Sequence, residues 1–185
     1  LFGQEDVGLV FITVLINTLI LPLVAVGVMR GLEMIDSFHL EDRMERIGPY
    51  LVVLILYLWM YINFTRRGTV PTAYTAFTLG MVIALSITFF VNVFSKISAH
   101  AVGMGGLVAM VLITMLFFDS QGMKIMLGSW GNFRISLSFL LLFIIVVAGL
   151  VGSSRLKLKA HVDIEIYGGY LIGFLSQLIA LRYYF

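Results

Sequence analysis

The sequence contains no cysteine, and charged residues fill only 12% of its 185 positions. The absence of cysteine excludes disulfide bridges, cysteine-ligated zinc and a thiol nucleophile. The scarcity of charge, together with 61% hydrophobic residues and a mean hydropathy of +1.05, excludes an ordinary water-soluble surface. A formal net charge of +2 is too small to indicate a nucleic-acid partner. We therefore expect lipid to be the solvent of this chain.

Long apolar runs account for most of the sequence. A membrane-spanning helix needs about 17–25 predominantly apolar residues, and six stretches meet or approach this length: 7–29, 49–64, 70–94, 101–118, 135–152 and 166–184. The first residues hold no basic segment and no small-residue cleavage site, so we expect no signal peptide. The predicted fold class is all-α: a polytopic membrane protein in which six transmembrane helices form a bundle, with residues 1–185 as a single transmembrane domain.

Six spans place alternate loops on opposite sides of the membrane. Loops 30–48, 95–100 and 153–165 share one side, and loops 65–69 and 119–134 share the other. All three histidines, His39, His100 and His161, fall on the first side. Segment 30–48 alternates apolar and charged residues, which predicts either a short amphipathic helix on the membrane surface or a solvated connector. One face of the membrane is thus expected to carry nearly all the ionisable groups.

A basic stretch between the last two apolar runs, GSSRLKLKAHVDIEIYGG, carries a recognisable order of residues. Its Ser154-Arg155, His161 and Glu165 resemble the third signature block of the type 2 phosphatidic acid phosphatase superfamily, in which the acidic position is Asp. Ser98 and His100 resemble the second block, Pro-Ser-Gly-His, with its Pro and Gly replaced. The first block, a Lys followed after six residues by Arg-Pro, is absent, and either segment 43–49 or Lys96 stands in for it.

The resemblance implies a membrane-integral phosphatase that uses neither a metal nor a cofactor. His161 would attack phosphorus to give a phosphohistidine, Glu165 would orient its ring, and His100 would protonate the leaving oxygen and later activate water. The phosphate oxygens would be held by a further set: Arg155, Lys96, Ser98, Arg46 and Arg43. The composition agrees, because a chain without cysteine or an acidic metal-binding cluster has imidazole as its obvious nucleophile near neutral pH.

Spacing supports one of these pairings independently of the resemblance. On a helix that begins near His161, Glu165 lies one turn further along the same face and can reach the ring. The remaining charges of the stretch have simpler interpretations. Lys157 and Lys159 suit anionic headgroups, and Asp163 suits solvent.

Several choices stay open at this level. The expected partners are membrane lipids and a lipid phosphate substrate, with phosphatidic acid, phosphatidylglycerophosphate and prenyl phosphates or pyrophosphates as candidates. The alternatives are a non-catalytic member of the same fold that binds a lipid phosphate, and a small transporter or channel, for which polar residues at mid-span are expected. The positive-inside rule favours the cytoplasmic side for the site, whereas the resemblance favours the outer face of a bacterial inner membrane. The oligomeric state is not predicted.

Overall fold

A computed structural model describes residues 4–38, 40, 42–68, 70–118, 123–126 and 132–185. Contacts divide the chain into two compact units. The first comprises Leu1–Ile97 with Ser176–Phe185, and the second comprises Ser98–Leu175. The predicted single domain over residues 1–185 stays a prediction.

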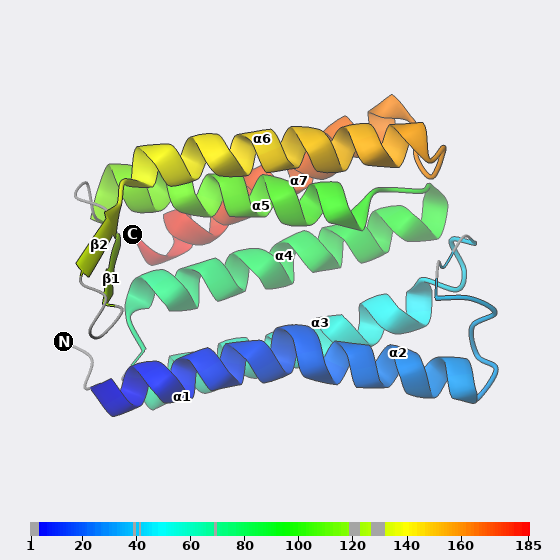
Figure 1. Ribbon diagram of the computed structural model, residues 1–185. Helices are drawn as coiled ribbons and strands as arrows, with labels where there is room; N and C mark the ends of the chain where they lie inside the picture. Colours follow the sequence, from blue (N-terminus) through cyan, green and yellow to red (C-terminus); the bar gives the residue numbers. More distant parts are fainter. Residues whose placement is uncertain (1–3, 39, 41, 69, 119–122, 127–131) are drawn as a thin grey trace. The chain divides into compact units, whose positions relative to one another are not determined.

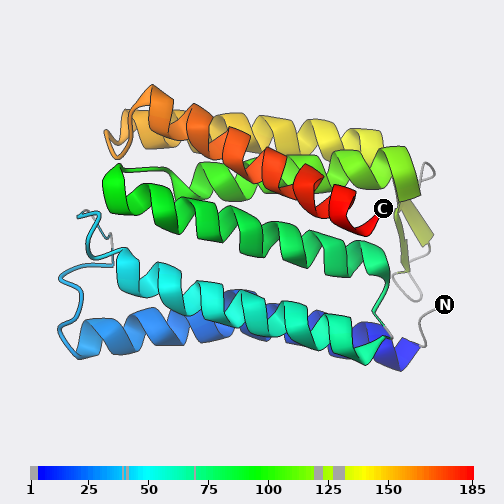
Figure 2. The same cartoon turned by 180° about the vertical axis from the view of Figure 1, so that it is seen from behind.

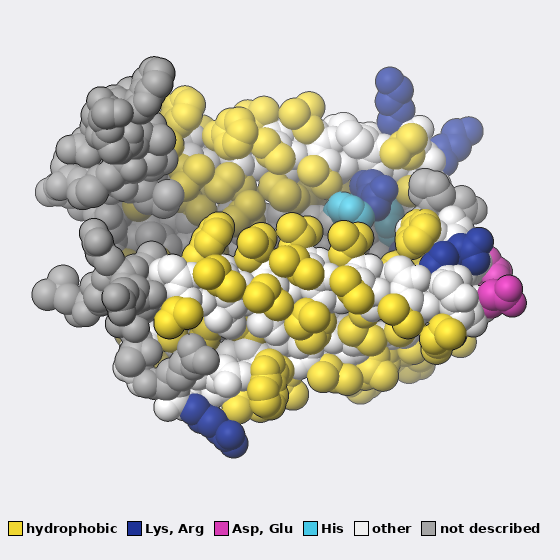
Figure 3. Space-filling view, turned by 60° about the horizontal axis from the view of Figure 1, so that its bottom comes forward, with side chains coloured by type: hydrophobic (Ala, Val, Ile, Leu, Met, Phe, Trp, Pro, Cys, Tyr) yellow, Lys and Arg dark blue, Asp and Glu magenta, His cyan; other side chains and the backbone are white. Residues whose placement is uncertain are grey.

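Six helical segments are long and apolar enough to cross a membrane, as predicted. They are Gly8–Gly31, Ile47–Arg66, Thr72–Phe94, Ala99–Phe118, Leu137–Lys157 and Asp163–Tyr184. Hydrophobic side chains cover the helices between their ends, and the charged side chains lie near the ends (Figure 3). Large exposed groups such as Phe11, Phe90 and Phe139, each about two-thirds exposed, are expected where lipid rather than water is the solvent. The helical part of the chain therefore has the architecture of an integral membrane protein.

The first unit is built from antiparallel helices that follow one another in the chain. The run of α1 (Gln4–Leu15), η1 (Ile16–Ile20) and α2 (Leu21–Gly31) packs along α3 (Ile47–Arg67), which packs along α4 (Thr72–Phe94) (Figures 1 and 2). Gly68, at φ 64°, makes the turn between α3 and α4 in a left-handed conformation that glycine adopts without strain. Met60, Phe64 and Val70 form its buried apolar cluster.

A π-helical turn interrupts the first span directly before Pro22. Proline has no backbone N–H and its ring clashes with the carbonyl four residues earlier, so a regular α-helical ladder cannot pass this point. The chain widens to the π-helix η1 over Ile16–Ile20, and α2 resumes with proline in its first turn. Asn17 is buried in η1, and its side-chain amide donates a hydrogen bond to the carbonyl of Thr13 at 2.8 Å.

The connector after α2 does not form the amphipathic helix that its pattern allowed. Its described residues make turns, and Glu33 and Leu40 adopt positive φ angles of 58° and 48°. Two left-handed non-glycine residues are incompatible with a continuous right-handed helix. The connector is irregular, as a solvated connector would be, and its solvation stays a prediction. His39 lies outside the described residues.

The second unit is a three-helix layer closed by a short hairpin. The chain passes through α5 (Ala99–Ile113), η2 (Thr114–Phe118), β1 (Met123–Met126), β2 (Asn132–Ile135), α6 (Leu137–Lys157) and the first part of α7 (Asp163–Tyr184). The two strands pair antiparallel, with Met123 opposite Ile135. The sequence predicted only a loop over 119–134, since this stretch has little periodicity, and the hairpin is a finding of the structure. α5 and α6 run side by side (Figure 1).

Glycines allow α5 and α7 to touch through their backbones. A Cβ added at Gly173 would collide with the carbonyl oxygen of Val102, and one added at Gly105 would collide with the carbonyl of Tyr170. At Gly169 the nearest atom, the Cβ of Ala101, would lie 2.9 Å away. Small residues at such positions let membrane helices approach closely, where van der Waals contact replaces the missing hydrophobic driving force. This contact fixes α5 against α7.

We expect Gly173→Ala to lower the free energy of unfolding by about 1–3 kcal/mol, because its new methyl group meets backbone that cannot move aside without separating the helices. Thermal unfolding in detergent measures the effect. Gly168→Ala is the matched control, since a Cβ there meets nothing within 4 Å and alanine favours the helix by up to about 1 kcal/mol. Equal loss of stability in the two variants would contradict the close contact.

Candidate active site

The predicted catalytic residues lie at the end of the second unit where α5 and α7 begin and α6 ends. The backbone N–H of Ser98 donates to the carbonyl of Glu165 at 3.3 Å, which ties the starts of α5 and α7 together. Ser98 is completely buried and caps α5, where its hydroxyl accepts from the N–H of Ala101 at 3.4 Å. His100 and His161 therefore lie at the same end of this unit, as alternation of the loops predicted.

His161 and Glu165 form a close pair. Nδ1 of His161 lies 2.6 Å from Oε2 of Glu165, and the two side chains are only 4% and 16% exposed. An ionised carboxylate can only accept, so Nδ1 carries the proton that is shared with it. The lone pair of the ring then resides on Nε2, the form in which an imidazole acts as a nucleophile. The predicted contact is confirmed, whereas the catalytic role of the pair stays a prediction.

The route of this contact differs from the one predicted. α7 begins at Asp163, so His161 precedes the helix and does not share a helical face with Glu165. Glu165 is the third residue of α7 and reaches back over the helix start, where the N–H of Val162 also donates to Oε2 at 3.3 Å. A glutamate at this position is the acidic half of a capping box, and its length suits the return to the N-cap. One carboxylate thus caps α7 and holds the His161 ring.

Shortening this side chain tests that dual role. We expect Glu165→Asp to lose one of the two contacts, which lowers stability by about 0.5–2 kcal/mol through the cap and slows turnover roughly tenfold, the equivalent of about 1.4 kcal/mol. Thermal unfolding and phosphate release would be measured on the same preparation. Asp163→Asn is the control, because Asp163 is exposed at the same helix start. Full activity and stability of Glu165→Asp would show that its length is immaterial.

Arg155 contacts the second histidine. Its Nη2 lies 2.7 Å from Nδ1 and 3.4 Å from Nε2 of His100. A guanidinium can only donate, so Nδ1 of His100 accepts and carries no proton in this arrangement. Nε of Arg155 is buried without a hydrogen-bond partner among the described residues. The Arg155 guanidinium thus contacts His100 through Nη2, while its Nε–H has no hydrogen-bond acceptor among the described residues.

Arg155 was expected in a loop and instead belongs to a helix. α6 continues to Lys157, five residues beyond the predicted end of the span. The residues after Gly152 include no helix breaker, and Arg155 and Lys157 in the last turn favour the negative end of the helix dipole. Arg155 therefore extends from a rigid element, which fixes its direction better than a loop would.

Three of the predicted phosphate ligands, Arg43, Arg46 and Lys96, belong to the first unit. Arg43 donates from Nη1 to the carbonyl of Phe94 at 2.7 Å, and Arg46 donates from Nε to the carbonyl of Leu40 at 2.7 Å. These guanidinium groups stabilise the connector of their own unit, and their role toward phosphate stays a prediction. Lys96 is exposed and also belongs to the first unit, two positions before Ser98 in the chain.

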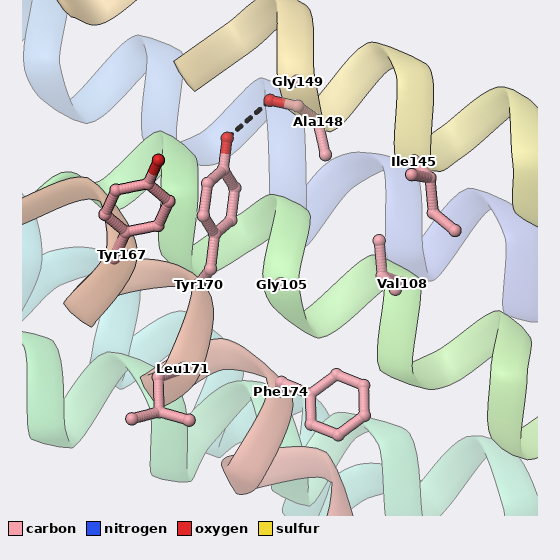
Figure 4. Close-up of a pocket in the computed structure, with 9 residues that line it drawn as sticks. All are labelled: Gly105, Val108, Ile145, Ala148, Gly149, Tyr167, Tyr170, Leu171 and Phe174. Atoms are coloured by element: carbon pink, nitrogen blue, oxygen red, sulfur yellow. Dashed lines mark hydrogen bonds between the residues drawn. The ribbon is translucent and has the colours of Figure 1, made fainter. Parts of the chain in front are cut away.

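Tyr170 is a residue that the sequence interpretation missed. Its hydroxyl donates to the carbonyl of Ala148, and so joins α7 to α6 (Figure 4). Its backbone lies against Gly105 of α5. A tyrosine inside an apolar run resembles many lipid-facing aromatics, so no local signal separates it from Tyr167. Within the second unit it connects the helices that carry His100, Arg155 and Glu165.

The helices define the class of this molecule as an integral membrane protein, and the polar end of its second unit holds two side-chain pairs, Arg155 with His100 and His161 with Glu165. Comparison with protein-family models, curated proteins and solved structures gives no match. Among the described residues, no group of three or more His, Asp or Glu side chains is placed to hold a metal ion.

Proposed function

We propose that this protein is an integral membrane phosphatase that hydrolyses a lipid phosphomonoester or a prenyl pyrophosphate through a phosphohistidine intermediate. The observation that carries the proposal is the buried His161 ring, whose Nδ1 is bound to Glu165 at 2.6 Å. A histidine oriented by a carboxylate is a recurrent arrangement for nucleophilic and acid-base chemistry, and in the proposed reaction Nε2 is the attacking atom.

In the first step, Nε2 of His161 bonds to phosphorus and the bond from phosphorus to the lipid oxygen breaks. The electron pair leaves with that oxygen, which takes a proton from His100. In the second step, water attacks the phosphohistidine and gives its proton to His100. The bond between nitrogen and phosphorus breaks, inorganic phosphate leaves, and both imidazoles return to their starting state.

Arg155 would stabilise the equatorial oxygens of the phosphoryl group. Its planar fork matches phosphate geometry, and its buried Nε has no other partner among the described residues. Arg155 is hydrogen-bonded to Nδ1 of His100, so the same guanidinium lies beside the ring that would protonate the leaving oxygen.

Ser98, Lys96, Arg46 and Arg43 stay candidate phosphate ligands in this proposal. Lys157 and Lys159 are exposed and suit anionic headgroups beside the site. We place the site at the outer face of a bacterial inner membrane, as the resemblance to the phosphatase superfamily implies. Phosphatidic acid, phosphatidylglycerophosphate and prenyl phosphates or pyrophosphates are the candidate substrates.

Release of inorganic phosphate from mixed detergent micelles tests the proposal. The purified protein is offered each candidate lipid in the presence of a metal chelator, because the proposed chemistry needs no metal. Release that persists with chelator and disappears in His100→Ala supports it. Binding of the lipids without any release would instead identify a non-catalytic lipid-phosphate-binding protein.

A transporter is the second candidate, and one observation favours it. In the first unit, the side-chain oxygens of Gln177 and Asn92 are buried without a hydrogen-bond partner among the described residues. Polar side chains inside a membrane often mark a transport path. Gln177 also donates to the carbonyl of Phe77 at 3.4 Å, and its side chain fills the space over Gly80. This packing argues against an open path at Gln177. Ion flux into liposomes that is lost in Gln177→Leu would establish transport.

A further inference from the structure

An apolar groove of about 440 Å³ lies between the three helices of the second unit. Its walls include Gly105 and Val108 of α5, Ile145 and Gly149 of α6, and Tyr170 and Phe174 of α7 (Figure 4). The Tyr170 hydroxyl is already bound to the Ala148 carbonyl, so the ring presents its apolar face to the groove. The volume lies within the range of about 300–1,000 Å³ that ligand pockets occupy.

The groove begins close to the candidate active site on every helix that forms it. Gly149 precedes Arg155 by six residues on α6, which is about 9 Å along the helix axis. Gly105 follows His100 by five residues on α5, about 8 Å along that axis. On α7, Tyr167 follows Glu165 by two residues. The groove therefore lies within about two helical turns of the polar end of the unit, on the same three helices that carry the candidate site.

The rim of the groove faces the lipid. Ile145 is 47% exposed, Leu171 is 58% exposed and Tyr167 is 67% exposed, and all three lie on helices long enough to span the bilayer. Hydrocarbon surrounds a helix at this depth, and an apolar groove there offers water no hydrogen-bond partner. A hydrocarbon chain is the occupant whose chemistry fits both the lining and the surroundings.

We propose that this groove binds the hydrocarbon chain of the lipid whose phosphate is processed by His161, and that Gly149 keeps it open. The inference rests on the proposed phosphatase function, because the groove lies within about two helical turns of the candidate site on the same three helices. A Cβ at Gly149 would meet nothing within 4 Å, so the space beside it belongs to the groove and not to a packed interface. Gly105 is different, since its missing side chain accommodates the backbone of Tyr170.

Gly149→Leu is the direct test, because Gly149 lines the groove and a Cβ there meets no protein atom within 4 Å. We expect kcat/KM for long-chain phosphatidic acid in mixed micelles to fall about tenfold or more, the scale on which an apolar pocket discriminates by size. Short-chain phosphatidic acid, whose tails end before the groove, should be hydrolysed at the wild-type rate. Gly168→Leu is the matched control: its Cβ also meets open space, it does not line the groove, and it should change neither rate.

The outcomes separate this inference from the proposed function. If the wild type hydrolyses both lipids and Gly149→Leu does so with unchanged long-chain kinetics, the groove does not bind the chain. The proposed phosphatase function would then still hold. An equal loss for both lipids would also overturn the groove inference, because the effect would then lie at the site. Absence of hydrolysis by the wild type would overturn the proposed function.

A binding measurement tests whether the groove holds a lipid chain, and it does not depend on turnover. The probe is a non-hydrolysable phosphonate analogue of long-chain phosphatidic acid that carries a photoreactive diazirine in its chain. We expect it to label residues 145–149 and 167–174, and to lose this labelling in Gly149→Leu. Labelling spread over all lipid-facing helices and unaffected by Gly149→Leu would identify ordinary bilayer lipid as the occupant and overturn the inference.

Discussion

Replacing His161 by alanine is expected to reduce phosphate release on the order of 10⁴-fold or more, because the proposed reaction loses its nucleophile. The ring is buried and bound to Glu165 at 2.6 Å, so no neighbouring group can take its place without rearrangement. Release of inorganic phosphate from a radiolabelled lipid phosphate measures the loss. Retention of even a tenth of the wild-type rate in His161→Ala would exclude His161 as the nucleophile.

A trapping experiment makes the same prediction independently of rates. His100→Ala should keep the attacking ring but slow both the departure of the lipid oxygen and the activation of water. With a substrate whose leaving group needs no proton, such as p-nitrophenyl phosphate, the phosphohistidine should accumulate in His100→Ala. Mass spectrometry should then find an acid-labile, alkali-stable phosphate on the peptide that contains His161. Phosphate on another residue, or none at all, contradicts the intermediate.

Arg155→Ala is the second change for which we expect a large effect, a loss of about 10²–10³-fold in kcat, which is typical when one preorganised donor to a transition state is removed. Arg155→Lys should recover only part of this loss, because lysine keeps the charge but not the planar fork. Lys157→Ala is the matched control, with the same charge two residues further along α6 and an exposed side chain. Its kcat should stay within about twofold of the wild type.

The split between kcat and KM tells whether Arg155 acts on the reacting group. A residue that serves only as a headgroup contact would raise KM and leave kcat unchanged. Equal effects of Arg155→Ala and Lys157→Ala would mean that general positive charge, and not the guanidinium bound to His100 at 2.7 Å, supports the reaction.

Hydropathy predicted the spans well, because the requirement for an apolar stretch of bilayer length acts on each segment separately. The predicted ends of the helices were less accurate, because this requirement says nothing about the polar residues on either side of an apolar stretch. Residues that flank an apolar run can belong to its helix, as Arg155 does at the end of α6, or lie outside it, as His161 does before α7. Hydropathy cannot separate these cases, since neither residue belongs in the apolar interior.

The connector 30–48 shows a different kind of limit. Its alternation of apolar and charged residues suits an amphipathic helix, but positive φ angles at Glu33 and Leu40 stop one from forming. Arg43 and Arg46 are bound to the carbonyls of Phe94 and Leu40. Tertiary hydrogen bonds of this kind stabilise an irregular backbone, and they involve partners up to 51 positions away in the chain.

Counting residues against the thickness of a bilayer was enough to predict an integral membrane protein with six spans and to put His100 and His161 on one side. The sequence could not show that Arg155 meets His100, that Glu165 caps α7 while it holds His161, or that Tyr170 lines an apolar groove. These contacts depend on the rotation and register of neighbouring helices. Close backbone packing at Gly105 and Gly173 sets that register for α5 and α7, and no local pattern encodes it.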